Sequence, residues 1–79
     1  MVVDFREELC LQQNSKYHFS YCWVKTDTAT EEMVDLDYSQ SCTYEEMMNA
    51  VCAHGFGPDK VHNHFLNNPC DSITLSYEY

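Results

Sequence analysis

The stretch DTATEEMVDLDYSQSCTYEEMM, residues 27–48, contains the junction between the two patterns that decide the predicted fold. In its first half, polar and apolar residues alternate with a period of two, which is typical of a half-buried strand. Its second half begins a segment whose apolar residues recur with the spacing of a helix. The stretch also holds seven carboxylates and no lysine or arginine. It therefore predicts a strand followed by a helix, both of them strongly acidic.

The second half predicts a helix over residues 44–54. Thr43 and Glu46 have the spacing of a capping box, in which each side chain accepts a hydrogen bond from the other residue's backbone N–H. Gly55 follows where a left-handed residue commonly ends a helix. Five apolar residues have the i, i+3, i+4, i+7, i+8 spacing of a core-facing stripe: Tyr44, Met47, Met48, Val51 and Cys52.

The first half predicts a strand over residues 31–38, entered through a hairpin loop at residues 27–30. The expected apolar face consists of Glu32, Val34, Leu36 and Tyr38. The expected solvent face consists of Glu31, Met33, Asp35 and Asp37. A helix capped by Thr28 with Glu31 is the alternative, and the period of two favours the strand.

Residues 17–26 and 72–79 also alternate and predict two further strands. The first is rich in aromatic and β-branched residues, which favour a pleated, half-buried surface. Its two faces are Tyr17, Phe19, Tyr21, Trp23 and His18, Ser20, Cys22, Val24. The inward face of the second is expected to be Ile73, Leu75, Tyr77 and Tyr79. The aromatic stripe is interpreted as core.

Residues 2–13 fit two interpretations. Asp4 with Glu7 has capping-box spacing, and Phe5 with Leu9 suits one face of a short helix. The alternation of Leu9 and Leu11 instead indicates a strand over residues 8–13 that turns at residues 14–16. The helix is favoured.

A second helix is predicted to begin at Pro58, a residue suited to the first turn, and to end at residues 67–69. Its inward residues are expected to be Val61, Phe65 and Leu66. Together these elements predict one domain over residues 1–79 of the α+β class. The expected architecture is a small antiparallel sheet of three or four strands with two or three helices packed on one face.

The charge and the cysteine content indicate the cellular compartment of the protein and the type of surface that it binds. Four basic and 13 acidic residues give a formal charge of −9. Such a chain is repelled by nucleic acid and anionic membranes and attracted to basic protein surfaces. The number of cysteines, five, is odd, so they cannot all pair with one another. The first residues also lack the pattern of a signal peptide. We therefore expect free thiols, a cytoplasmic location and no membrane span.

The acidic residues are the candidate partner-binding site. On a strand, Asp35 and Asp37 lie about 6.6 Å apart on one side, near the step between neighbouring phosphates. Tyrosines are enriched in protein interfaces. The predicted binding residues are Glu31, Glu32, Asp35, Asp37, Tyr38, Tyr44, Glu45 and Glu46. The alternative is a solvated face that maintains solubility. The absence of lysine and arginine from residue 26 to residue 59 favours binding.

Two other functions are weighed against this one. Zinc accepts cysteine and histidine, and Cys52, His54, His62, His64 and Cys70 lie close in sequence, but their spacing matches no standard zinc pattern. A structural module is the other alternative, with residues 72–79 pairing with a second chain at the sheet edge. No nucleophile motif accompanies the possible Cys/His pairs, so we predict neither an enzyme nor a cofactor.

In size, charge and α+β pattern, the whole chain resembles the small acidic proteins with which bacteriophages disable host machinery, the anti-CRISPR and DNA-mimic inhibitors. The resemblance implies a non-enzymatic protein of the host cytoplasm. It also implies that the protein blocks a basic, nucleic-acid-binding surface of a partner protein rather than binding nucleic acid itself.

Overall fold

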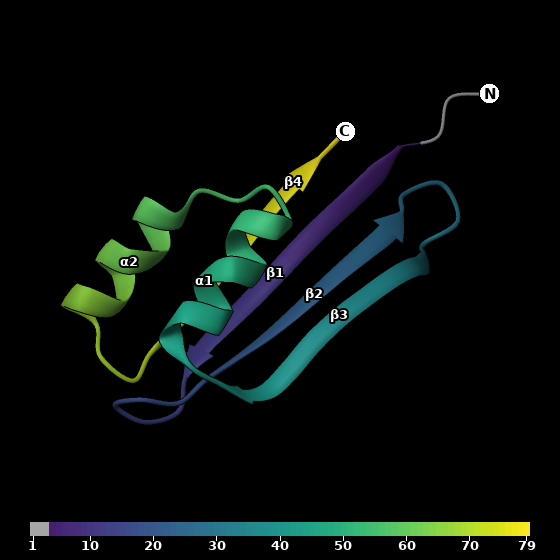
Figure 1. Cartoon of the computed structure of the whole chain (residues 1–79). Helices are drawn as coiled ribbons and strands as arrows, with labels where there is room; N and C mark the ends of the chain where they lie inside the picture. Colours follow the sequence, from purple (N-terminus) through teal and green to yellow (C-terminus); the bar gives the residue numbers. More distant parts are fainter. Residues whose placement is uncertain (1–3) are drawn as a thin grey trace.

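Four strands form one antiparallel sheet, and two helices cover one of its faces (Figure 1). The computed structural model describes residues 4–79. The elements are β1 (Phe5–Gln13), β2 (Phe19–Asp27), β3 (Glu32–Cys42), α1 (Tyr44–Ala53), α2 (Pro58–Asn67) and β4 (Ser72–Glu78). The strand order is β3-β2-β1-β4. The predicted α+β class and antiparallel sheet are confirmed, with four strands and two helices among the described residues.

The favoured helix over residues 2–13 is wrong, and the strand alternative is correct and longer than predicted. Residues 2 and 3 lie outside the described part of the chain. β1 is a central strand that pairs with β2 on one side and β4 on the other. Leu9 and Leu11 are buried beneath the helices, at 0% and 1% exposure. This pairing on both sides outweighs the weak local preference for a helix.

β2 confirms the predicted strand and most of its aromatic face. Phe19 and Trp23 are buried in the core, and Tyr21 packs partly buried against it. Tyr17 was predicted to share that face, but it precedes the strand and is 70% exposed. The reason is that residues 14–18 form the connection between β1 and β2, so Tyr17 is outside the regular alternation of the strand.

α1 confirms the predicted helix and both of its ends. Thr43 and Glu46 form the complete capping box, and Gly55 has a φ of 82°. A left-handed residue at this position is strongly favoured to be glycine. Met47, Ala50 and Val51 are buried, whereas Cys52 is exposed, so its predicted core position is wrong. The buried stripe is narrower than the sequence pattern because α1 contacts the sheet along one line only.

α2 begins at Pro58 as predicted and buries Val61 and Phe65. Leu66 was predicted to face inward, but it is 68% exposed. Val61 and Phe65 are four residues apart and lie on one side of the helix, while Leu66 is rotated away from them. α2 therefore also contacts the core through a narrow stripe.

β3 is a strand as predicted, but the prediction of its faces is wrong. Val34, Leu36 and Tyr38, expected to be inward, are 50%, 42% and 59% exposed. Asp37, expected to face solvent, is half-buried on the side of the helices. β3 is an outer strand, so its helix side meets the margin of α1 and its other side has no helix above it (Figure 1).

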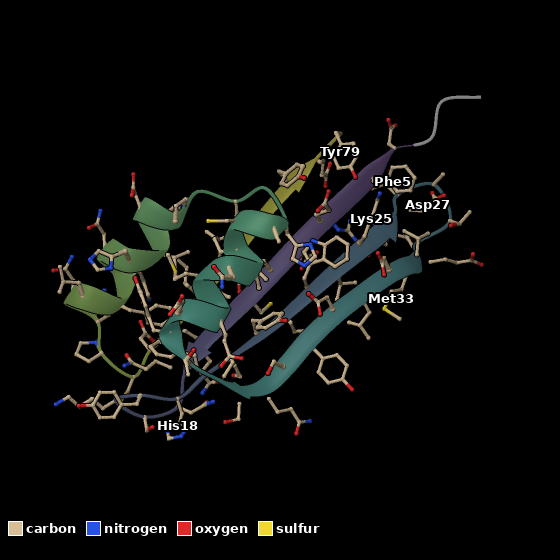
Figure 2. All side chains as sticks on the ribbon, viewed as in Figure 1. Phe5, His18, Lys25, Asp27, Met33 and Tyr79 are labelled. Atoms are coloured by element: carbon tan, nitrogen blue, oxygen red, sulfur yellow. The ribbon has the colours of Figure 1, made fainter. Side chains whose placement is uncertain are left out.

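The core lies between the helices and one part of the sheet. It comprises Leu9, Leu11, Phe19, Trp23, Cys42, Met47, Val51, Val61, Phe65 and Leu75. The molecule is elongated, 46 × 21 × 18 Å, because the sheet extends beyond the helices. Phe5, Lys25, Asp27 and Tyr79 lie at this projecting end (Figure 2). We call the sheet face opposite the helices the open face.

In the described residues, no helix has the length and apolar character needed to cross a bilayer.

Candidate interaction surface

The predicted acidic residues lie along one margin of the molecule. β3 is an outer strand of the sheet, and α1 follows it directly after Thr43. No lysine or arginine occurs in β3 or α1. We call this margin the acidic edge; its residues are Glu31, Glu32, Asp35, Asp37, Glu45 and Glu46. These carboxylates differ in how far they are engaged by other groups.

Asp37 is held by two side chains of the protein itself. The His54 Nε2 atom lies 2.9 Å from Asp37 Oδ2, and the Tyr21 hydroxyl donates to the same carboxylate at 3.4 Å. Burial, together with the Asp37 charge, raises the pKa of Tyr21. His54 also stacks on Trp23. Asp37 therefore anchors α1 to the sheet, so its role is structural as well as electrostatic.

Asp35 is exposed and lies directly opposite Lys25 on the neighbouring strand. Its Oδ1 accepts the backbone N–H of Leu36 at 2.9 Å. The Lys25 ammonium lies 4.4 Å from the ring centroid of Phe5. A hydrogen bond with Tyr79, aided by the charges of Glu7 and Asp35, raises the pKa of Lys25. Asp35 is thus accessible to a partner, although Lys25 partly offsets its charge.

Glu31 is in the turn between β2 and β3 rather than in the strand as predicted. It has a φ of 58°, and its carboxylate pairs with Arg6 at 3.1 Å. Arg6 also pairs with Glu8 at 3.0 Å. Exposed ion pairs contribute little to stability. This pair nevertheless places a cation beside Glu31, which makes Glu31 a weaker candidate for binding.

The two glutamates of α1 have different roles. Glu46 accepts the backbone N–H of Thr43 at 3.0 Å, and this hydrogen bond lowers the pKa of Glu46. Glu45 is exposed in the same first turn. Negative charge at both positions is favoured by the helix dipole. Glu32, Asp35 and Glu45 are therefore the members of the acidic edge whose charge is most available to a partner.

The two predicted tyrosine anchors lie on different surfaces. Tyr38 is on the open face beside Cys22. The hydroxyl of Tyr44 lies 2.6 Å from His62 Nδ1, and its ring meets Phe19 edge-on. Burial raises the pKa of Tyr44. Tyr44 therefore joins the two helices, and only Tyr38 is a freely exposed anchor.

β3 also has backbone N–H and C=O groups that face away from the sheet, a feature that was not predicted from the sequence. Successive residues of a strand direct their N–H and C=O groups to opposite sides. The backbone N–H of Thr28 donates to the Asp4 carbonyl, and that of Asn14 donates to the His18 carbonyl. Even-numbered residues of β1 therefore bond to β2. The odd-numbered residues of β2 then bond to β3, at Asp35 and Asp37. The backbone groups of Leu36 and Tyr38 consequently point away from the sheet.

The buried carboxylate of Glu7 was also not predicted from the sequence. Glu7 is 6% exposed, and it accepts hydrogen bonds from Trp23 Nε1 at 2.9 Å and the Tyr77 hydroxyl at 2.7 Å. Burial acts to raise the pKa of Glu7, but the hydrogen bonds outweigh it and lower the pKa. The bond to Glu7 raises the pKa of Tyr77 to about 12. No local sequence signal distinguishes Glu7 from the half-buried Glu8, because cross-strand neighbours create the site.

The residues of the zinc alternative do not form a common site. His54 bonds to Asp37, His62 to Tyr44, and the Nε2 atom of His64 lies 3.2 Å from Asp71 Oδ2. Among residues 4–79, no three Cys, His, Asp or Glu side chains are grouped so that they could hold a metal ion. These cysteines and histidines are therefore close in sequence but do not lie together in the structure.

Comparisons with known proteins do not assign the chain to a family. No protein-family model matches it, and neither the curated proteins nor the solved structures give a match. The function must accordingly be inferred from the acidic edge and its surroundings.

Proposed function

We propose that this protein is a non-enzymatic inhibitor that occupies a basic, nucleic-acid-binding surface of a partner protein. The observation that carries the proposal is the acidic edge, where an outer strand and the following helix bear carboxylates and no lysine or arginine. The concrete form is a phage-type anti-defence protein, similar in action to anti-CRISPR and DNA-mimic inhibitors, acting in the host cytoplasm.

The physical basis is charge complementarity on a shaped surface. Proteins that bind nucleic acid present lysine and arginine to successive phosphates. Asp35 and Asp37 are spaced by one strand repeat, about 6.6–6.8 Å. The formal charge of −9 steers the approach toward a basic surface. Because β3 and α1 are regular elements, the backbone that carries the carboxylates is ordered before binding, which reduces the entropic cost of association.

The outer edge of β3 also supports a specific mode of docking. An extended segment of the partner can add to this edge through the outward backbone groups of Leu36 and Tyr38. On such a segment, alternate side chains face opposite sides of the sheet. Lysine or arginine on one side would meet Asp35, and apolar residues on the other would meet Leu36 and Tyr38. Strand addition would thus combine charge with apolar contact.

The test compares two triple charge reversals. The first changes Glu32, Asp35 and Glu45, whose side chains make no contact with the core. The second changes Asp59 in α2, Asp71 between α2 and β4, and Glu78 in β4, none of which is in β3, α1 or the turn before β3. Both alter the formal charge equally. Bound proteins are captured from a bacterial lysate at about 50 mM and 500 mM salt, where the Debye lengths differ several-fold. They are then challenged with duplex DNA.

The proposal predicts a bound protein that is released by duplex DNA and by high salt. We expect the first triple variant to weaken its binding about tenfold or more and the second to weaken it much less. Equal losses in both variants would show that only net charge matters. Unchanged binding after reversal of Glu32, Asp35 and Glu45 would contradict the proposal.

A structural module remains a second candidate, because β4 is the outer strand at the opposite side of the sheet. The outward positions of this strand include the uncharged Ser72, Thr74 and Ser76, with one carboxylate, Glu78, at its end. Pairing of β4 with a second copy would give a dimer held by backbone hydrogen bonds. Sedimentation equilibrium at high protein concentration tests it, and a strict monomer would exclude it.

A further inference from the structure

Cys10 and Cys22 face each other at the centre of the sheet. They are directly opposed residues of β1 and β2. Their neighbours Leu9, Leu11 and Trp23 point into the core. Because side chains alternate along a strand, both cysteines lie on the open face. The fold therefore brings together two thiols that are 12 positions apart in sequence.

The geometry of this pair follows from the hydrogen-bond pattern of β1. Even-numbered residues of β1 bond to β2, as Asn14 shows by donating to His18. Cys10 and Cys22 are therefore a hydrogen-bonded pair, with α-carbons about 5.5 Å apart. A disulfide accepts separations of about 4.4–6.8 Å. The β-carbons of such a pair are more widely spaced than most disulfides prefer, so a bond here would be strained and easily reduced.

Both thiols are accessible to a reagent. Cys10 is exposed and Cys22 is half-buried, and they line a hollow of about 380 Å³ on the open face. The Thr74 hydroxyl donates to Cys10 Sγ at 3.6 Å. Thr74 is on β4, so this contact directs the sulfur of Cys10 away from Cys22. One rotation between staggered positions of Cys10 χ1, about 120°, redirects it toward Cys22.

The other cysteines are in different environments. Cys42 is buried, its thiol donates to the Phe19 carbonyl at 3.4 Å, and burial raises its pKa. Cys52 is on the outer side of α1, and Cys70 is in the connection between α2 and β4. Cys52 and Cys70 are exposed and serve as internal comparisons for the opposed pair.

We propose that Cys10 and Cys22 form a cross-strand dithiol that is reversibly oxidised to an intramolecular disulfide by a small-molecule disulfide. The more exposed Cys10 thiolate attacks one sulfur of the oxidant, forming a mixed disulfide and releasing one thiolate. The Cys22 thiolate then attacks the Cys10 sulfur and expels the second. The two protein thiols lose two electrons and two protons, and the oxidant becomes two thiols. This proposal is independent of the acidic edge.

The test uses glutathione disulfide and a chain carrying Cys52→Ser and Cys70→Ser, which leaves the pair intact. We expect oxidation to remove two hydrogen atoms from the intact mass, and peptide mapping to join Cys10 with Cys22. Adding Cys22→Ser removes the resolving thiol, so glutathione should remain on Cys10. The stable Cys10 adduct should be about tenfold more abundant in this variant, because an adjacent thiol resolves it intramolecularly.

A control substitution distinguishes the loss of a thiol from disruption of the sheet. The Ser20→Ala variant on the same face keeps both thiols and should form the disulfide as readily as its parent. Circular dichroism of each variant checks that the sheet is intact. Accumulation of the Cys10 adduct to the same level with and without Cys22 would overturn the proposal. Mapping of the disulfide to Cys42 would also overturn it.

Discussion

The imidazole of His54 lies flat on the indole of Trp23, with ring centroids 4.0 Å apart and 15° between the ring planes. His54 ends α1, and Trp23 is in the middle of β2. The same imidazole bonds to Asp37 of β3 at 2.9 Å. One side chain therefore fastens the end of α1 to two strands and sets the position of the acidic edge relative to the core.

Replacing His54 with alanine should destabilise the protein by about 1–3 kcal/mol, because it removes an aromatic stack and a hydrogen bond to a carboxylate. Urea denaturation measures this loss. Trp23 is the sole tryptophan, so its fluorescence reports directly on the stack. The control is His18→Ala at the exposed β1–β2 connection, expected to change stability by about 0.5 kcal/mol. A His54 variant as stable as its control would show that the stack contributes nothing.

Glu7→Gln should make stability less dependent on acidic pH. The folded-state pKa of Glu7 is lowered below its usual 4.5, so ionised Glu7 favours the folded state at pH above that value. This contribution is lost as pH falls through the depressed pKa. The difference between wild type and variant, about 1–3 kcal/mol near neutrality, should therefore shrink in acid. Chemical denaturation at several pH values measures it.

The matched control for Glu7 is Glu8→Gln. Glu8 is the next residue but faces the open side of the sheet, where it pairs with Arg6. We expect a change within about 0.5 kcal/mol for this surface substitution. If both variants lost stability equally, burial of Glu7 would not be the cause.

Tyr77 should ionise well above the ordinary tyrosine pKa. Its hydrogen bond to Glu7 raises its pKa to about 12. Stability gained from the protonated hydroxyl is present below its ordinary pKa of 10.0 and is lost as pH rises toward the folded value. Ultraviolet titration should show a late component that disappears in Tyr77→Phe. Glu7→Gln should move this component toward lower pH, and an unshifted component would argue against the bond.

Met47→Ala should destabilise the fold by about 2–5 kcal/mol, because it leaves a cavity beneath α1. Met47 is completely buried, whereas Met33 is 59% exposed on β3. Met33→Ala removes the same atoms from the surface and should cost less than about 0.5 kcal/mol. Thermal unfolding of both variants measures the difference. Similar losses would mean that α1 does not cover the core as described.

Thr43→Ala should cost about 0.5–2 kcal/mol, because it removes half of the capping box at the start of α1. Thr43 Oγ1 accepts the backbone N–H of Glu46 at 3.2 Å. Thr30→Ala, in the exposed turn between β2 and β3, is the control with the same change of side chain. Circular dichroism with urea denaturation distinguishes the two. No loss in the Thr43 variant would show that the cap is energetically unimportant.

The candidate site was only partly predictable. The sequence places Asp35 and Asp37 on one side of a strand, and they do share a side. It contains no indication that His54, 17 residues beyond Asp37, reaches back to that carboxylate. Nor does it reveal that Arg6 pairs with Glu31 from a strand 25 residues away. Such contacts depend on how distant segments pack together. The prediction from the sequence therefore included more carboxylates than are free to bind a partner.

The sequence by itself determined the helix α1, the strands β2 and β4 to within two residues of their ends, and the negative charge. Period, capping and turn residues act over a few positions, so they can be read locally. Only the tertiary structure decided that β3 is an outer strand, that Val34 and Leu36 are exposed, and that Cys10 opposes Cys22. Burial on a strand depends on what covers each face, and distant segments of the chain supply that cover.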